Sequence, residues 1–157
     1  MAVYETIEGP RDAAGLRVAV VAARFNDFIV ASLLKGACAA WERCGGDAAN
    51  LTIVRVPGAF ELPMAAKRLA ALACYDAVVA LGCVIRGDTA HFEFVAGECA
   101  SGLARAALDT GVPVVFGVLT VETVEQALER AALSQLDKGG ESIEVAIEMA
   151  TLFRKLR

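Results

Sequence analysis

The chain has 157 residues, a length that suits one domain able to bury a core of its own. Its net charge is −4 and no run of basic side chains occurs, which argues against nucleic acid as a partner. No uncharged apolar stretch reaches about 18 residues, and the first 12 residues have no apolar core. We therefore expect neither a membrane span nor a signal peptide.

The cysteine and histidine content restricts the chemistry further. Five cysteines are an odd number, and no two are spaced as C-x-x-C. Without a signal peptide, this pattern predicts free thiols in a cytoplasmic protein and no disulfide framework. His91 is the only histidine, and no cysteine cluster accompanies it, so we expect no metal site.

Apolar runs alternate with helical patterns along the whole chain, with no linker between them. The runs have the composition of strands buried on both faces and cover residues 17–24, 51–56, 77–84 and 112–119. Helices are predicted over residues 26–43, 61–73, 89–109 and 120–136, and from Gly139-Gly140 to the end of the chain. This alternation predicts an α/β domain with a parallel sheet covered by helices.

Local signals mark the helix ends. Asn26 or Asp27 can cap the first helix, and Pro63 suits the first turn of the second. Thr123 to Gln126 fits a capping box. The last helix has two apolar stripes, which predicts one face covered by the sheet and one covered by a partner subunit. The first stripe is Ile143, Ala146, Ile147, Ala150 and Phe153. The second is Val145, Met149, Leu152 and Leu156.

Ligands of such sheets bind beyond the carboxyl ends of the strands, so functional residues are expected just after residues 24, 56, 84 and 119. Phe25 follows the first strand, where it can pack the turn or stack on a flat ring. Glu61 follows the second strand, where it can offset a helix dipole or accept hydrogen bonds from ligand hydroxyls.

The segment after the third strand leads through Gly87 into a helix N-terminus, a place receptive to phosphate, although Asp88 there would also serve as a cap. His91 lies in the first turn of that helix. A lone histidine is commonly structural, but this position favours proton transfer. Phe116, Arg130 and Lys138, taken alone, read as core packing and solvated charges. No G-x-G-x-x-G, Walker A or Ser-His-Asp arrangement occurs.

Four segments, in this order and spacing, together resemble lumazine synthase, an enzyme of the riboflavin pathway. They are Arg24-Phe25-Asn26, residues 57–63 (PGAFELP), residues 84–92 (VIRGDTAHF), and residues 116–120 (FGVLT) followed by 125–131 (EQALERA). The resemblance extends from about residue 17 to residue 153.

The resemblance implies a reaction and an assembly. The family condenses 5-amino-6-ribitylamino-pyrimidinedione with 3,4-dihydroxy-2-butanone 4-phosphate to 6,7-dimethyl-8-ribityllumazine, without metal or organic cofactor, and riboflavin synthase is the next enzyme. The implied fold is a flavodoxin-like three-layer α/β/α sandwich with a four-stranded parallel sheet. Subunits would form pentamers, stacked pentamers or shells with sites between neighbours. Residues 1–15 of this single domain would form an arm that pairs with a neighbouring subunit.

The resemblance also implies residue roles. Phe25 would stack on the pyrimidine, Glu61 would hold ribityl hydroxyls, and His91 would shuttle protons. Substrate-binding positions would also include Ala59, Phe60, Val84, Ile85, Lys138, and Phe116 from the neighbouring subunit. The phosphate would be bound by Gly87, Asp88, Thr89 and Arg130.

The chain departs from the family between Arg130 and Lys138, where many members have a Gly-x-Lys-x-Gly turn. Residues 131–137 (AALSQLD) contain no glycine, which predicts a longer helix here and favours pentamers or stacked pentamers over shells. Asp88 stands where Glu or Ala is more frequent. The rival readings are a non-catalytic flavin- or lumazine-binding protein and a structural shell protein on the same scaffold.

Overall fold

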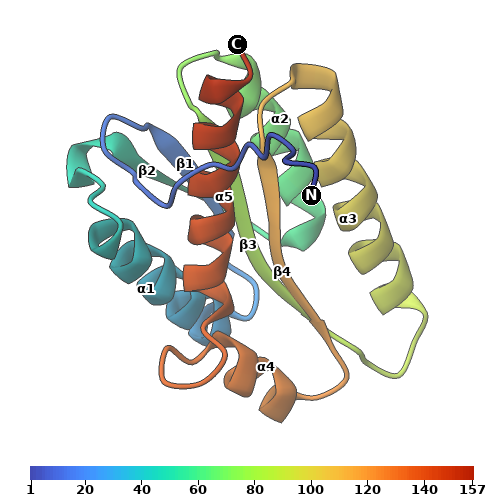
Figure 1. The fold of residues 1–157 in the computed structure, drawn as a ribbon. Helices are drawn as coiled ribbons and strands as arrows, with labels where there is room; N and C mark the ends of the chain where they lie inside the picture. The colour runs from blue at the N-terminus through green and yellow to red at the C-terminus, as the bar shows by residue number, and fades with distance from the viewer.

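Four parallel strands form the central sheet of the computed structural model, which describes residues 1–157 (Figure 1). The sheet order is β2-β1-β3-β4. The strands are β1 (Val18–Ala23), β2 (Leu51–Val56), β3 (Ala77–Ile85) and β4 (Val114–Val121). The helices are α1 (Asp27–Arg43), α2 (Leu62–Ala71), α3 (His91–Thr110), α4 (Val124–Ala131) and α5 (Lys138–Lys155), with 3₁₀ turns at Ala48–Asn50 and Ala59–Glu61.

The helices cover both faces of the sheet. One face packs against α1, α4 and α5, and the other against α2 and α3. Residues of β1 alternate between the two cores: Val18, Val20 and Ala22 face the first, and Ala19, Val21 and Ala23 face the second. The strand order follows the flavodoxin-like pattern with one strand fewer. The predicted three-layer α/β/α sandwich is confirmed.

The strand and helix predictions hold apart from their ends. β4 begins after Pro113, because proline has no N–H for a ladder, and it extends to Val121. The first buried stripe of α5 is confirmed over Ile143 to Ala150, while Phe153 is 40% exposed. The second stripe is partly exposed in a single chain: Val145 and Leu156 are exposed, and Met149 and Leu152 are half-buried. Its burial by a partner subunit stays a prediction.

The prediction of a longer helix between Arg130 and Lys138 was wrong. α4 ends at Ala131, and the chain turns through residues 132–137. Asp137 takes a left-handed backbone (φ 43°), and its carboxylate accepts from the N–H of Gly140 at 3.1 Å. At Gly139 a Cβ would clash with the Leu33 carbonyl of α1. The close contact of α5 with α1 therefore overrides the helix propensity of this segment.

The capping predictions were half right. Thr123 caps α4, because its hydroxyl accepts from the N–H of Gln126 at 3.1 Å. The Gln126 side chain accepts from the N–H of Glu122 rather than from Thr123. Asn26 is the N-cap residue of α1, but its side chain does not cap the helix; it has a left-handed backbone and bonds elsewhere.

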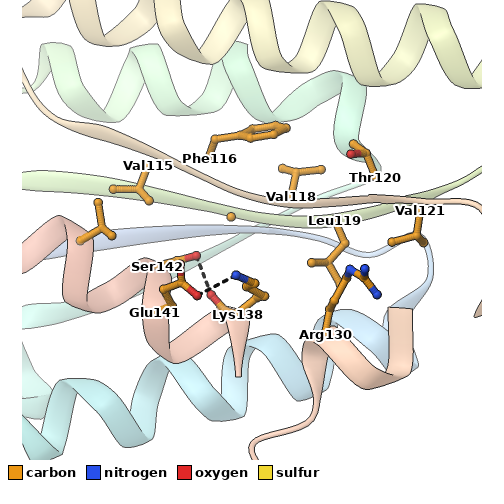
Figure 2. Close-up of a pocket in the computed structure, with 12 residues that line it drawn as sticks. Val115, Phe116, Val118, Leu119, Thr120, Val121, Arg130, Lys138, Glu141 and Ser142 are labelled. Carbon is orange, nitrogen blue, oxygen red and sulfur yellow. Dashed lines mark hydrogen bonds and ion pairs between the residues drawn. The ribbon is translucent and has the colours of Figure 1, made fainter. Parts of the chain in front are cut away.

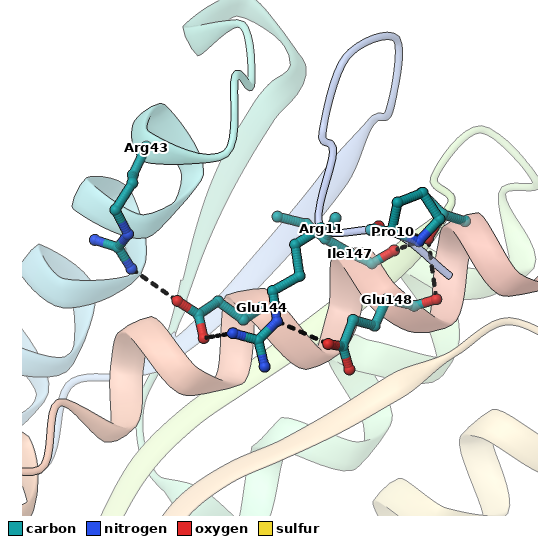
Figure 3. Close-up of polar contacts among 7 residues, drawn as sticks. Pro10, Arg11, Arg43, Glu144, Ile147 and Glu148 are labelled. Carbon is teal, nitrogen blue, oxygen red and sulfur yellow. Dashed lines mark hydrogen bonds and ion pairs between the residues drawn. The ribbon is translucent and has the colours of Figure 1, made fainter. Parts of the chain in front are cut away.

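The N-terminal segment crosses α5 and is fastened to it (Figures 1 and 3). Arg11 pairs with Glu144 at 3.1 Å and Glu148 at 2.7 Å, and Arg43 reaches Glu144 at 2.8 Å. The Thr151 hydroxyl donates to the carbonyl of Pro10 at 2.8 Å. The second half of the predicted arm is thus held by its own chain. The exposed residues 1–7 precede it, and their pairing with a neighbour stays a prediction.

No helix combines the length and apolarity that a membrane crossing requires. All five cysteines are free thiols, with Cys74 exposed and Cys83 and Cys99 buried.

Candidate active site

A hollow of about 730 Å³ lies at the carboxyl ends of β1, β2 and β3. We call it the strand-end hollow. Its volume falls within the usual range for small-molecule sites, roughly 300–1,000 Å³. Nine of the predicted site residues line it: Phe25, Ala59, Phe60, Glu61, Val84, Ile85, Gly87, Thr89 and His91.

One wall of the strand-end hollow comes from the turns after β1 and β2. Phe25 and Phe60 present aromatic rings there and are 71% and 58% exposed. Glu61 ends the 3₁₀ turn before α2, and its carboxylate makes no hydrogen bond or ion pair within the chain. This wall offers flat apolar surface and one free carboxylate, groups suited to a ring that carries hydroxyls.

The opposite wall comes from β3 and the segment before α3. The backbone N–H groups of Gly87, Asp88 and Thr89 donate to no acceptor within the chain, so they are available to an anion. The Thr89 hydroxyl accepts from the N–H of His91 at 3.3 Å, whereas Asp88 caps nothing and does not line the hollow. The dipole of the 20-residue helix α3 adds positive potential at this end.

The His91 side chain is exposed in this wall and makes no hydrogen bond or ion pair. Its backbone is set by the first turn of α3, so the imidazole projects from a rigid element beside the free amides. An unengaged imidazole at a ligand hollow can accept and return a proton.

Arg86 fastens the segment before α3, a role that the sequence did not indicate. Its guanidinium pairs with Glu93 of α3 and, at 2.9 Å, with Glu122, and lies 4.4 Å from the centre of the Phe92 ring. The hydrogen bond from Arg86 lowers the pKa of Glu93, which keeps the pair ionised. The pair joins residues on both sides of the free amides. Charged side chains seven residues apart, flanking a glycine turn, are the signal that could have indicated it.

Cys83 also lines the strand-end hollow but offers no nucleophile. Burial raises the pKa of its thiol to about 11, because the thiolate would lose its hydration. The thiol therefore stays protonated near neutral pH, and it packs in the core between the sheet and helices α1, α4 and α5.

Of the four remaining predicted residues, Asp88 lines neither of the two hollows, and the other three line the second, a hollow of about 510 Å³ along β4 (Figure 2). We call it the edge hollow, because β4 is an outer strand of the sheet. Phe116, Arg130 and Lys138 line it. Phe116 projects to one side of β4, while Arg130 and Lys138 approach from α4 and α5 on the other side.

The two cations of the edge hollow differ in how far they are engaged. Lys138 pairs with Glu141 at 2.8 Å, a partner that the sequence did not indicate. Arg130 donates to the carbonyl of Gln126 at 3.1 Å, and Glu129 lies 3.9 Å away. A guanidinium has five N–H donors, so Arg130 retains free donors for an anion. Within one chain, these cations line a different hollow from His91.

No group of three or more histidine, cysteine, aspartate or glutamate side chains is arranged to hold a metal ion. The strand-end hollow instead combines aromatic surface, a free carboxylate, free amides at a helix N-terminus and a free imidazole. With the sheet order, these features define a doubly wound parallel α/β protein with a small-molecule site at the carboxyl edge of its sheet.

Comparison with known proteins gives the family. The model of the 6,7-dimethyl-8-ribityllumazine synthase family matches residues 15–154, and the chain belongs to this family. It is similar to the 6,7-dimethyl-8-ribityllumazine synthase of Edwardsiella ictaluri (strain 93-146), with 54% identity over 154 residues, 98% of this chain and 99% of that protein. It is also 52% identical to the enzyme of that name from Nitratidesulfovibrio vulgaris (strain Hildenborough), over 97% of each chain.

Proposed function

We propose that the protein condenses 5-amino-6-ribitylamino-pyrimidinedione with 3,4-dihydroxy-2-butanone 4-phosphate to give 6,7-dimethyl-8-ribityllumazine, phosphate and water. The observation that carries the proposal is the family match over residues 15–154 together with the nine predicted residues that line one hollow. Riboflavin synthase would consume the product.

The chemistry of the walls supports roles for the two substrates. Phe25 stacks on the pyrimidine ring, and the free Glu61 carboxylate accepts hydrogen bonds from ribityl hydroxyls. Ala59, Phe60, Val84 and Ile85 shape the ring pocket. The amides at Gly87 to Thr89 bind the phosphate, and His91 moves protons during imine formation and phosphate elimination. Asp88 contributes through its backbone.

A second copy of the chain completes the site in this proposal. The edge hollow of the neighbouring subunit supplies Phe116 to the ring, and Lys138 and Arg130 to the polar groups and phosphate. The support is the separation of the two hollows within one chain and the partly exposed second apolar stripe of α5. Such head-to-tail contacts between unlike surfaces close into rings.

We propose that these rings are pentamers or stacked pentamers. The longer helix that favoured pentamers over shells is absent, because the chain turns at residues 132–137. Light scattering of the purified protein distinguishes a pentamer, a decamer and a shell by mass. The five free thiols support a location in a reducing compartment, and we propose the cytoplasm.

Mixing two impaired variants, assayed at a low concentration of the butanone phosphate, tests the composite site. His91→Ala damages only the strand-end hollow, and Arg130→Ala only the edge hollow, so each variant alone should be slow. In co-expressed mixed rings, about a quarter of the sites should pair an intact hollow of each kind and regain activity, because head-to-tail interfaces join unlike surfaces. Separately purified variants, combined without exchange of subunits, are the control. Mixed rings as inactive as either parent would place the whole site within one subunit.

The first assay tests the reaction itself. Purified protein is mixed with both substrates, and lumazine is followed by absorbance and fluorescence against a control without enzyme, because the condensation proceeds slowly unaided. Saturable formation well above the control is expected. Tight binding of lumazine or riboflavin without any rate enhancement would favour the non-catalytic binding protein. A protein that shows no rate enhancement and no such binding would refute both readings.

A further inference from the structure

Asn26 occupies an unusual place between β1 and α1. Its backbone is left-handed, with φ 60° and ψ 45°, a conformation that costs most residues but is tolerated by asparagine and glycine. Its side chain makes no capping bond. Instead, the Nδ2 group donates to the carbonyl oxygen of Cys83 at 2.9 Å. Neither capping nor helix propensity accounts for an asparagine with this geometry.

The bond closes a gap in the sheet. The pairing of β1 with β3 ends at Ala22 and Leu81, so Cys83 lies beyond the last paired residue of β3. Cys83 is only 3% exposed, and a buried carbonyl needs a donor. The Asn26 amide supplies that donor and joins the turn after β1 to the carboxyl end of β3.

This is the one hydrogen bond between residues 24–26 and strand β3. On the β2 side the backbone is held twice, because the N–H of Arg24 donates to Val56 at 2.8 Å and that of Phe25 to Pro57 at 3.0 Å. Phe25 precedes Asn26, and Val84 follows Cys83; both line the strand-end hollow. The Asn26 bond therefore joins the residue next to Phe25 to the residue next to Val84.

We propose that Asn26 is a positioning residue for the reaction: it holds the Phe25 ring at the distance from β3 that lets a pyrimidine stack between the two walls. This inference rests on the proposed function of the strand-end hollow. Two properties are required together, a left-handed backbone and a side-chain donor two bonds beyond Cβ. Glycine has only the first, and aspartate cannot donate when ionised.

Two substitutions separate these properties. Asn26→Gly keeps the backbone and removes the donor, and should raise the KM for the pyrimidine about 3–10-fold, the worth of one neutral hydrogen bond. Asn26→Asp keeps the side-chain shape but places a carboxylate oxygen against the Cys83 carbonyl oxygen, and the two repel each other. It should raise the KM for the pyrimidine at least as much as Asn26→Gly does. The KM for the butanone phosphate should change less than twofold in both. Asn50→Gly, at the amino end of β2, is the matched control and should change neither constant.

A double-mutant cycle with Phe25→Ala distinguishes positioning from a general structural role. Once the ring is gone, Asn26→Gly should raise the pyrimidine KM no further. Equal rises for both substrates, additive effects with Phe25→Ala, or an unchanged pyrimidine KM in Asn26→Gly would each overturn the proposal. Unfolding temperatures and ring mass are measured for every variant, and a KM change that merely tracks a lower unfolding temperature would count as structural.

Titration with 6,7-dimethyl-8-ribityllumazine, followed by its fluorescence, makes the same comparison without turnover. If the wild type binds lumazine but makes none, the proposed function fails, while a weaker affinity of Asn26→Gly still supports the positioning role. Equal affinities of wild type and Asn26→Gly would overturn that role alone. A wild type that neither turns over nor binds lumazine would overturn both.

Discussion

Replacing His91 with alanine should lower kcat by about 10²–10⁴-fold without abolishing turnover, because that is the usual contribution of a positioned proton-transfer group. Much of the remaining rate comes from holding two substrates together, for which effective molarities of about 10⁵ M or more are known. The imidazole of His91 makes no bond within the chain, so its loss should leave folding intact. Steady-state kinetics against the uncatalysed reaction measure the effect.

Two comparisons sharpen the His91 test. Added imidazole should restore part of the lost rate in His91→Ala, because the side chain is exposed to solvent, and should restore less in His91→Gln, where the space is filled. A variant with normal unfolding temperature and normal lumazine binding but no detectable activity would mean that His91 does more than move protons. An unchanged kcat would remove it from the mechanism.

Arg130→Ala should raise the KM for the butanone phosphate by about 10–100-fold, the worth of one or two hydrogen bonds to a charged group, and leave the pyrimidine KM nearly unchanged. The guanidinium has one close partner within the chain, the Gln126 carbonyl, so removing it leaves no buried charge unpaired. Arg130→Lys keeps the charge but loses the planar guanidinium, so its KM for the butanone phosphate should lie between those of the wild type and Arg130→Ala. Inorganic phosphate should inhibit the Arg130→Ala variant more weakly than the wild type.

Arg68→Ala is the matched control for Arg130→Ala. Arg68 is an exposed arginine of α2 outside both hollows, so its loss removes the same net charge without touching a site. It should change neither KM. Equal losses for both substrates in Arg130→Ala would refute the phosphate role and place the residue among the groups that hold the assembly together.

The predicted α/β order is confirmed, and nine predicted site residues gather at the expected edge of the sheet, because both depend on local patterns. Residues 18–23 and 77–85 are apolar at every position, so each strand requires cover on both faces. Right-handed crossovers then bring the ends of β1, β2 and β3 to one edge. For that reason Phe25, Glu61 and His91, far apart in the chain, were expected together and are found lining one hollow.

Long-range contacts decided the features that the sequence misjudged. Residues 131–137 have helical propensity, but the glycine contact between α5 and α1 forces a turn. Asparagine is a common helix cap, but the Asn26 side-chain amide instead donates to the buried Cys83 carbonyl of β3. Neither outcome is visible locally, because the competing partner lies 57 residues away from Asn26 and on another helix from Gly139.

The sequence alone thus determined the fold class and the edge of the sheet where most predicted site residues gather, because periodicity and strand-end position are local properties. Only the tertiary structure decided that Phe116, Arg130 and Lys138 line a separate hollow along β4. It also revealed the ion pair of Arg86 with Glu122 and the hydrogen bond from Asn26 to the Cys83 carbonyl. Such placements depend on which surfaces meet after the chain has packed, and no local pattern encodes that.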